Sequence, residues 1–462
     1  MLKFVTKSNF DVKLTEHFNN KPNTMKKSIF YLASLLLSTT SIMAQEVKFE
    51  EYDLSNGLHV VLQQDNSAPV VTTSVMYHVG SKDENPERTG FAHFFEHLLF
   101  EGTKNIKKGK WFEIVTSNGG TNNANTTDDR TYYYEVFPSN SLKLGLWMES
   151  ERMLHPVINQ DGVDTQNEVV KEEKRLRYDN QPYGHIIPEV KKLLFTKHPY
   201  RWTTIGSMDH LDAATLDEFL AFNKKFYVPN NAVLVVAGDL DIAKTKKMIQ
   251  DYYGDIPRGA DIKRNKIEEA PITKEISGTF YDANISKPAI ITAYRTPSMK
   301  TRDAYVLNMI STVLSDGKSS RLYKKIVDDK KMAMQVGALN FSQEDYGMYI
   351  LYGFPLGDVK LNDLLTEMDE EIVKIQNELI SEREYQKLQN KYENQFVNAN
   401  SSVEGIANSL AKYYMLFGDI NLINNEINIY KSITREEIKA VANKYLNPNQ
   451  RVRLEYLPKK DK

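Results

Sequence analysis

Phe226-Tyr227-Val228-Pro229-Asn230-Asn231-Ala232-Val233 ends a predicted helix and begins a predicted strand, and Tyr445-Leu446-Asn447-Pro448-Asn449-Gln450-Arg451-Val452 repeats this pattern later in the chain. The prolines Pro229 and Pro448 are 219 positions apart. The same offset of 219 separates two strand-like runs, Ala68-Pro69-Val70-Val71-Thr72-Thr73 and Lys287-Pro288-Ala289-Ile290-Ile291-Thr292. One offset at both ends of a segment indicates an internal duplication. We therefore predict two related halves, about 50–257 and 275–460.

The segment between the halves and the elements within them complete this prediction. Pro257 to Asn265 is polar, contains Pro and Gly and has no periodic apolar pattern, so 258–274 is predicted to be a linker. Runs rich in β-branched residues at 57–63 and 70–79 predict strands, whereas apolar residues at three- and four-residue steps over 142–154 and 364–380 predict helices. Strands and helices without strict alternation indicate an α+β fold with mostly antiparallel sheets backed by helices.

The N-terminal region contains the features of a secretory signal peptide. Met25-Lys26-Lys27 precedes an apolar run from Ile29 to Leu37, and a small residue, Ala44, precedes Gln45. We predict a signal peptide over 25–44, cleavage near Ala44/Gln45 and a periplasmic or secreted protein, with 1–24 as an over-extended start. The alternative is a buried N-terminal helix. No stable membrane span is expected, because a span needs about 20 apolar residues.

The overall composition narrows the chemistry. The chain has 462 residues, 59 Lys plus Arg against 61 Asp plus Glu, and no cysteine. The absence of a basic excess disfavours a nucleic-acid partner. The absence of cysteine excludes disulfides, thiolate zinc sites and a cysteine nucleophile. Any bound metal must therefore be held by His, Asp and Glu.

Histidine placement points to the first half. The nine histidines all precede residue 211. His93 and His97 lie in the segment Phe91 to Phe100, which lacks Gly and Pro and is predicted to be a helix. On a helix they lie one turn apart on one face, with Glu96 close to the same face. This His-x-x-Glu-His pattern is typical of inverted zincins, in which the histidines bind zinc and the glutamate is the general base. The alternative is a hydrogen-bonded pair of core histidines.

A catalytic zinc usually has a third protein ligand. Without cysteine, that ligand is another His or a carboxylate. The charged helical segment Gln166 to Lys174 offers several candidates, and spacing alone does not choose among them.

These motifs together resemble those of the pitrilysin/insulinase-type metallopeptidases, the M16 family, which includes the mitochondrial processing peptidases. The resemblance covers essentially the whole mature chain. It is carried by Asn56-Gly57-Leu58, Val79-Gly80-Ser81, Glu87 to Thr103, Gly119 to Asp128, Asn167 to Glu173 and Ser319-Ser320-Arg321-Leu322-Tyr323. It implies two duplicated α/β-sandwich halves of the LuxS/MPP-like metallohydrolase type.

The resemblance also implies a site and an activity. The third ligand of a single zinc ion would be Glu173, 76 residues beyond His97, while the neighbouring Glu172 is a surface charge. The activity would be endopeptidase cleavage of peptides or unfolded segments, with Glu96 activating a zinc-bound water. The edge of the segment 119–127 would pair with the substrate backbone by β-augmentation. The implied substrate-binding residues are Gly120, Thr121, Asn122, Asn123 and Ala124.

Two positions depart from the family pattern. Gln166 stands where many members carry a glutamate seven residues before the third ligand. No arginine occurs between Arg321 and Arg383, where the family pattern has an Arg and Tyr that grip the substrate carbonyl. We therefore expect a related partner subunit to supply that pair.

Two alternatives to an enzyme follow from the same residues. A non-catalytic M16-like assembly or scaffold subunit would be expected to lose one residue of the site, but His93, Glu96, His97 and Glu173 are all present. A zinc-dependent peptide-binding protein would keep all of them without cleaving. The histidines at 185, 198 and 210 are predicted to be hydrogen-bonding groups, and Tyr132-Tyr133-Tyr134 part of a strand.

Overall fold

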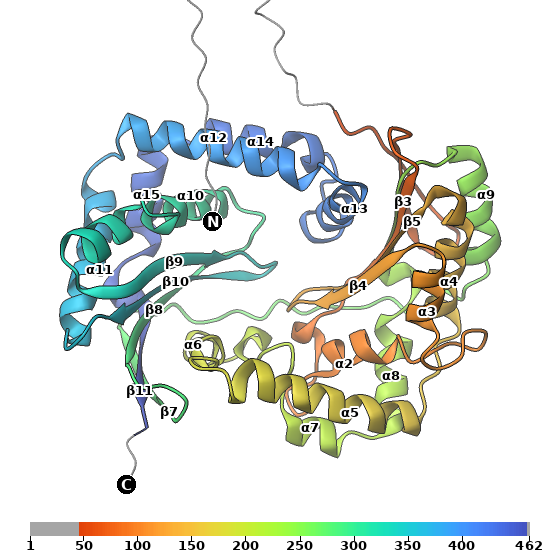
Figure 1. Ribbon diagram of the computed structural model, residues 1–462, viewed down its shortest axis with the longest axis horizontal. Coiled ribbons are helices and arrows are strands. Elements are labelled where there is room, and N and C mark those ends of the chain that lie inside the picture. Colours follow the sequence, from red (N-terminus) through yellow and green to blue (C-terminus); the bar gives the residue numbers. More distant parts are fainter. Residues whose placement is uncertain (1–45, 460–462) are drawn as a thin grey trace, which may run out of the picture. The chain divides into compact units, whose positions relative to one another are not determined.

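The computed structural model describes residues 46–459, so the predicted signal peptide and the segment before it lie outside the described residues. Two sheets organise this part of the chain (Figure 1). The strand order of the first is β1-β2-β6-β3-β5-β4, and that of the second is β7-β11-β8-β10-β9. The strands are β1 (Glu50–Asp53), β2 (His59–Gln64), β3 (Val70–Tyr77), β4 (Thr121–Thr126), β5 (Thr131–Pro138), β6 (Ala232–Gly238), β7 (Ile276–Asp282), β8 (Ala289–Pro297), β9 (Ala333–Phe341), β10 (Tyr346–Pro355) and β11 (Arg451–Pro458).

The two sheets have equivalent topologies. Each sheet contains one parallel pair of strands, β2 with β6 in the first sheet and β7 with β11 in the second. From β6 to β4 in the first sheet and from β11 to β9 in the second, all neighbouring strands are antiparallel. β3 and β8 begin at residues 70 and 289, and β6 and β11 begin at 232 and 451, so both pairs keep the offset of 219. The predicted duplicated α+β fold is confirmed, with mixed sheets that are mostly antiparallel.

Helices cover the faces of both sheets. In the first half, α4 packs on β3, β5 and α9, and α2 lies by β4 and β5. In the second half, α10, α11 and α15 pack on β8, β9 and β10 (Figure 1). No helix within residues 46–459 has the length and apolar character needed to cross a membrane. The helices are α2 (Phe91–Leu98), α3 (Trp111–Ser117), α4 (Leu142–Leu154), α5 (Gln160–Lys174), α6 (Ile186–Leu194), α7 (Met208–Ala213), α8 (Leu216–Phe226), α9 (Ile242–Tyr253), α10 (Arg302–Ser315), α11 (Leu361–Asn377), α12 (Glu382–Ala399), α13 (Val403–Lys412), α14 (Leu422–Ser432) and α15 (Arg435–Tyr445).

Each sheet also receives a helix from the other half. α6, from the first half, packs on β8 and β11, and its Val190 and Leu194 join the core of the second sheet. Reciprocally, α13 packs on β3 and β6, and its Ile406 and Leu410 join the core of the first sheet. Such reciprocal contacts are those expected of two halves related by an approximate two-fold axis. The halves therefore share buried apolar surface.

The segment predicted as the linker has no helix or strand, since α9 ends at Tyr253 and β7 begins at Ile276. It is nevertheless anchored. Arg264 pairs with Asp83 at 3.0 Å, and the Glu269 carboxylate accepts hydrogen bonds of 2.7 Å from the backbone N–H groups of Thr196, Lys197 and His198.

Candidate metal centre

Helix α2 carries the two motif histidines, and buried groups fix both its start and its middle. The carboxylate of Glu84 accepts hydrogen bonds of 2.9 Å from the N–H groups of Gly90 and Ala92, which would otherwise lack helical partners. Gly90 has φ of +100°, and a side chain there would lie 2.8 Å from the carbonyl oxygen of Ile205. The hydroxyl of Tyr133, on β5, donates to the Phe95 carbonyl at 3.0 Å. α2 is thus held against its sheet.

Aromatic packing fixes the other face of α2. Phe91 stacks on Phe219 of α8 with ring centroids 4.5 Å apart, and Phe95 stacks on Phe222 at 5.4 Å. These apolar contacts exclude water from one side of the helix, so His93 and His97 can face only the opposite side.

His93, His97 and Glu173 converge on one point. Glu173 lies in the last turn of α5, and its Oε2 is 3.5 Å from His93 Nε2 and 3.2 Å from His97 Nε2. Ligands about 2.0–2.1 Å from a tetrahedral zinc lie about 3.3 Å from one another. Within the described residues this is one group of His, Asp or Glu side chains whose ligand atoms all come within 4.8 Å. The donor set and its spacing fit zinc.

The second oxygen of Glu173 is held separately. Its Oε1 pairs with the Arg177 guanidinium at 2.9 Å, across the π-helical turn Arg175–Asp179 that follows α5. Burial alone would raise the pKa of Glu173, but hydrogen bonds from His93 and His97 and the charge of Arg177 hold it well below its ordinary value. Glu173 is therefore ionised and oriented, as a metal ligand needs to be. Glu172 lies exposed and pairs with Arg175 at 3.0 Å.

Glu96 lies beside the histidines on α2 and is half-buried. No side chain among residues 46–459 hydrogen-bonds or pairs with its carboxylate, so both oxygens are free to accept a proton.

Gln166 lies two helical turns before Glu173 on α5. Its Nε2 donates to Glu101 Oε1 at 2.5 Å, and Lys108 pairs with the other Glu101 oxygen at 2.9 Å. A carboxylate therefore does lie at this position, but it comes from the loop after α2. This hydrogen bond ties the loop after α2 to α5.

The predicted substrate-binding residues lie at a sheet edge. Thr121 to Ala124 belong to β4, the outer strand, while Gly120 is buried just before it. The N–H of Thr127 bonds to Arg130 across the hairpin turn, so alternation along the ladder turns the backbone groups of Ala124 toward the free edge. The N–H of Ala124 accordingly donates to Asn123 Oδ1 at 2.9 Å.

A cavity of about 520 Å³ lies between the halves next to this edge. It is lined by the turn after β4, the turn after β9, α6 and α13. Arg130 lines the cavity. Burial lowers the pKa of its guanidinium, and the charges of Tyr132, Glu96 and Asp129 raise that pKa by a smaller amount. On β10, the side chain of Tyr349 is buried.

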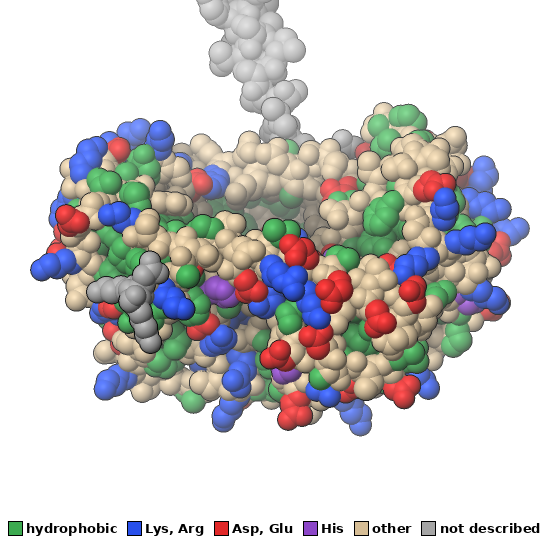
Figure 2. Space-filling view, turned by 60° about the horizontal axis from the view of Figure 1, so that its bottom comes forward, with side chains coloured by type: hydrophobic (Ala, Val, Ile, Leu, Met, Phe, Trp, Pro, Cys, Tyr) green, Lys and Arg blue, Asp and Glu red, His purple; other side chains and the backbone are tan. Residues whose placement is uncertain are grey.

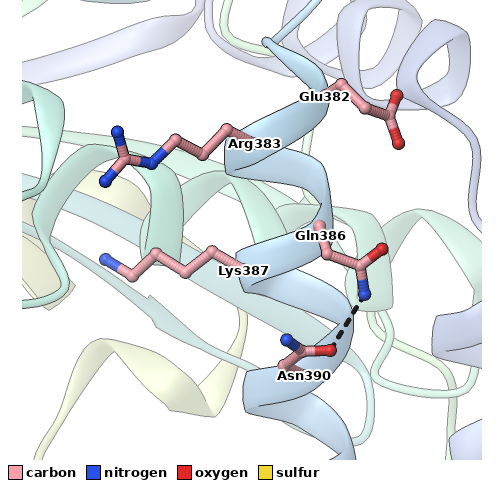
Figure 3. Close-up of a pocket in the computed structure, with 5 residues that line it drawn as sticks. All are labelled: Glu382, Arg383, Gln386, Lys387 and Asn390. Carbon is pink, nitrogen blue, oxygen red and sulfur yellow. Dashed lines mark hydrogen bonds between the residues drawn. The ribbon is translucent and has the colours of Figure 1, made fainter.

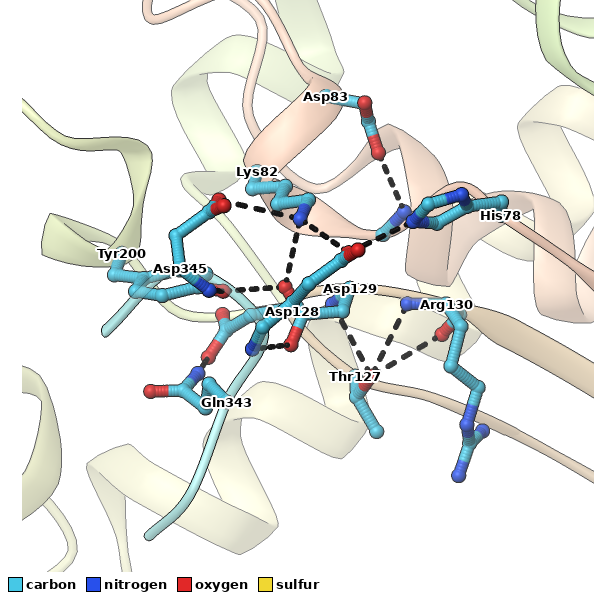
Figure 4. Close-up of polar contacts among 12 residues, drawn as sticks. His78, Lys82, Asp83, Thr127, Asp128, Asp129, Arg130, Tyr200, Gln343 and Asp345 are labelled. Carbon is cyan, nitrogen blue, oxygen red and sulfur yellow. Dashed lines mark hydrogen bonds and ion pairs between the residues drawn. The ribbon is translucent and has the colours of Figure 1, made fainter. Parts of the chain in front are cut away.

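A cluster of ion pairs joins the two halves beside the cavity (Figure 4). Lys82 pairs with Asp129 at 3.1 Å, with Glu344 at 2.7 Å and with Asp345 at 3.2 Å. His78 also contacts Glu344, at 2.7 Å. The turn after β9 is thereby fastened to the first half.

Among residues 46–459, other surface features carry no comparable chemistry. The hollow beside α12 is lined by charged and polar side chains of that one helix (Figure 3). Acidic and basic side chains are interspersed over the face in Figure 2. His198 contacts Asp345 at 3.3 Å, His210 accepts from the Thr89 N–H at 3.2 Å and His185 lies 3.5 Å from Asp179, so these histidines are hydrogen-bonding groups as predicted.

Fold and site together define a class: duplicated α+β proteins whose first half carries His-x-x-Glu-His with a glutamate from a second helix. Residues 59–206 match the family model "Insulinase (Peptidase family M16)", and 213–392 match "Peptidase M16 inactive domain". The chain belongs to peptidase family M16.

Relatives of the chain are named zinc proteases. It is 29% identical over 438 residues to the zinc protease PqqE of Helicobacter pylori, covering 92% of this chain and 97% of that protein. It is 21% identical over 396 residues to the uncharacterized zinc protease YmxG of Bacillus subtilis, covering 85% and 94%.

Solved structures share the fold. A protease from Helicobacter pylori has a TM-score of 0.84 at 27% identity, covering 89% of this chain and all 100% of that one. The first half of the periplasmic protease PqqL from Escherichia coli has a TM-score of 0.73 at 19% identity, covering 89% and 92%, a likeness in fold alone.

Sequence reasoning missed several groups that support the site. Arg177 lies four residues after Glu173, a spacing that could have indicated an ion pair across one helical turn. The side chains of Glu84 and Tyr133 bond to backbone atoms at the start and middle of α2. Glu84 lies six residues before Gly90 and Tyr133 lies on β5, and no sequence motif marked either of them.

Proposed function

We propose that this chain is a zinc-dependent endopeptidase that hydrolyses peptides or unfolded polypeptide segments. The observation that carries the proposal is the convergence of His93, His97 and Glu173 beside an unpaired Glu96. Membership of a family whose members are named zinc proteases supports it. His93, His97 and Glu173 would hold one zinc ion per chain.

The proposed chemistry divides between the ion and the chain. Zinc in such a site acts as a Lewis acid that polarises a carbonyl oxygen and lowers the pKa of water. Glu96 accepts a proton from the attacking water and passes it to the amine that leaves when the C–N bond breaks. Arg177 and the Tyr133–Phe95 bond keep Glu173 and α2 in place.

The edge of β4 would align the peptide. A substrate strand added to this edge would bond to the outward backbone groups of Asn122, Ala124 and Thr126, which reads main chain rather than side chains. Broad sequence tolerance follows. Asn123 Oδ1 would have to release the Ala124 N–H as the peptide binds.

Partner and location complete the proposal. A related M16-like subunit would supply the Arg/Tyr pair, because β10 contains no arginine. The chain would act in the periplasm or outside the cell. If the purified single chain cleaves peptides as a monomer at the rate of the assembled protein, the partner is not needed.

The proposal is tested with a fluorogenic unfolded substrate such as labelled casein. Chelation should abolish cleavage, and one equivalent of zinc per chain should restore it. If zinc binds but no cleavage occurs with or without a partner, the chain is a scaffold subunit. If labelled peptide binds without being cut, it is a zinc-dependent peptide-binding protein.

A further inference from the structure

The cavity between the halves holds more positive than negative side chains available to a ligand. Its lining includes the cations Arg130, Lys191 and Lys412 and the acids Asp128 and Asp129. Its volume of about 520 Å³ lies within the range of ligand sites. Elements from both halves enclose it, so it exists only in the folded whole of residues 47–459.

Both acids are already engaged. Asp128 accepts from Lys191 Nζ at 2.8 Å through each oxygen. Asp129 pairs with Lys82 at 3.1 Å and accepts from the Glu344 N–H at 3.0 Å. Because Lys191 is paired with Asp128, the cations of the lining that remain for a ligand are Arg130 and Lys412.

Among the described residues, neither Arg130 nor Lys412 forms an ion pair with a carboxylate. Arg130 Nη1 donates to the backbone carbonyl of Asn125 at 2.8 Å and to that residue's side-chain oxygen. In Figure 4 its guanidinium extends away from the neighbouring ion pairs. The Lys412 ammonium lies 5.6 Å and 5.3 Å from the ring centroids of Tyr413 and Phe417.

Both cations line the same cavity, so the charge of one acts on the other. Burial lowers the pKa of Lys412, the charge of Glu426 opposes this, and the charge of Arg130 lowers the pKa further. Glu426 is itself bound by the Tyr413 hydroxyl at 2.8 Å. Two like charges in a partly desolvated cavity are costly, and an anionic ligand between them would remove that cost.

Position links this pair to the substrate. Arg130 is the last residue of the turn between β4 and β5, and it donates a hydrogen bond to Asn125 at the end of β4. A peptide paired with β4 would therefore bring one of its groups to the mouth of the cavity. This step rests on the proposed function, because only a bound peptide would follow that edge.

We propose that Arg130 and Lys412 bind a carboxylate of the peptide, so that the chain selects substrates with an acidic side chain or a free C-terminus at that end of β4. The guanidinium fork matches both oxygens of a carboxylate, and the lysine adds a second charge. Each half of the duplicated chain contributes one of the two groups.

The test measures binding with the zinc-loaded Glu96→Gln protein, so that cleavage does not interfere. Three fluorescein-labelled pools of ten-residue peptides derive from one parent pool, which is neutral and has an amidated C-terminus. The first is unchanged, the second carries one Glu at successive positions, and the third has a free C-terminus. Fluorescence anisotropy should give a Kd about tenfold lower for the second or third pool than for the first. The pool that gains identifies the carboxylate.

Substitutions of Arg130 and Lys412 then test whether these two residues cause the preference for a carboxylate. Arg130→Gln and Lys412→Met should each reduce the ratio of Kd values to near one, whereas Lys412→Arg should keep it. Lys247→Met, an exposed lysine on α9, is the matched control and should also keep it. Equal or absent binding of the acidic pools, or a preference that survives both substitutions, overturns the proposal. Hydrolysis of the neutral pool by the unsubstituted protein is measured separately, so failure of the proposed peptidase activity is distinguishable.

Discussion

Glu173 uses its two oxygens for different partners. Oε2 faces His93 and His97, while Oε1 pairs with Arg177 at 2.9 Å. Its neighbour Glu172 lies on another face of α5 and is exposed. Adjacent glutamates therefore have different environments, because successive residues of a helix point about 100° apart.

Replacing each glutamate in turn separates these environments. Glu173→Gln should weaken zinc affinity by more than about 100-fold, since even partners of metal ligands contribute about 10–100-fold. Glu172→Gln, the matched control, should bind zinc as the unsubstituted chain does. Competition with a zinc-sensitive dye measures both. Equal affinities in the two variants would exclude Glu173 as a ligand.

At the scale of elements, the edge of β4 is the part that would meet substrate. Its alternation exposes the backbone of Ala124 but keeps that of Asn123 in the ladder with Tyr134. A proline is tolerated on an edge strand where the N–H faces solvent. A proline at this position would also remove the backbone N–H that a peptide paired with β4 would bond to.

Ala124→Pro should therefore keep the fold and raise KM by about 3- to 10-fold, the equivalent of one hydrogen bond. Ala124→Ser keeps the N–H and serves as the control. Circular dichroism checks folding, and cleavage kinetics give KM. If KM is unchanged in Ala124→Pro, the peptide does not bond to this N–H.

Local sequence patterns predicted the helices and strands well, but they did not predict which of these elements pack together. The predicted helix over 142–154 coincides with α4. The helix predicted over 364–380 corresponds to α11, which ends at Asn377 because the backbone at Glu378 is extended. His93, Glu96 and His97 were predictable because one helical turn fixes their spacing. Glu173 was not fixed by spacing, since its place depends on how α5 packs on α2.

Long-range placement limited the prediction further. The resemblance to the family supplied Glu173, but the contribution of Glu101 beside Gln166 follows only from the packing of α2 on α5. Arg130 and Lys412 come from different halves, and nothing in their local sequences places them on one cavity.

At the scale of the whole molecule, the halves are joined by exchanged helices and by the ion pairs around Lys82. Burial alone would lower the pKa of Lys82, but Asp129, Glu344 and Asp345 hold it above its ordinary value. Burial would raise the pKa of Glu344, yet His78 and Lys82 hold it well below. The cluster therefore stabilises the charged forms of both partners.

Lys82→Met would leave three carboxylates without their shared ammonium and should lower the free energy of unfolding by about 3–5 kcal/mol at pH 7. Lys110→Met, in an exposed pair with Glu113, should change it by less than about 0.5 kcal/mol. Guanidinium unfolding followed by circular dichroism measures both. A change no larger than that of the control would show that the cluster does not stabilise the fold.

The same variant has a defined pH dependence. Because the pKa of Glu344 is held below its ordinary value of 4.5, its contribution is present above pH 4.5 and is lost as the pH falls through the folded value. The difference in unfolding free energy between Lys82→Met and the unsubstituted chain should stay constant from pH 7 to about pH 4.5 and shrink as the pH falls further. A difference that grows would contradict this sign.

Replacement of Glu96 tests the central claim of a zinc peptidase most directly. Zinc content and cleavage of labelled casein are measured for Glu96→Gln and for Glu113→Gln, an exposed control on α3. Glu96→Gln should retain one zinc per chain while kcat/KM falls by about 10²–10⁴-fold, the range for a general base. Cleavage by zinc-loaded Glu96→Gln at the rate of the control would contradict the account.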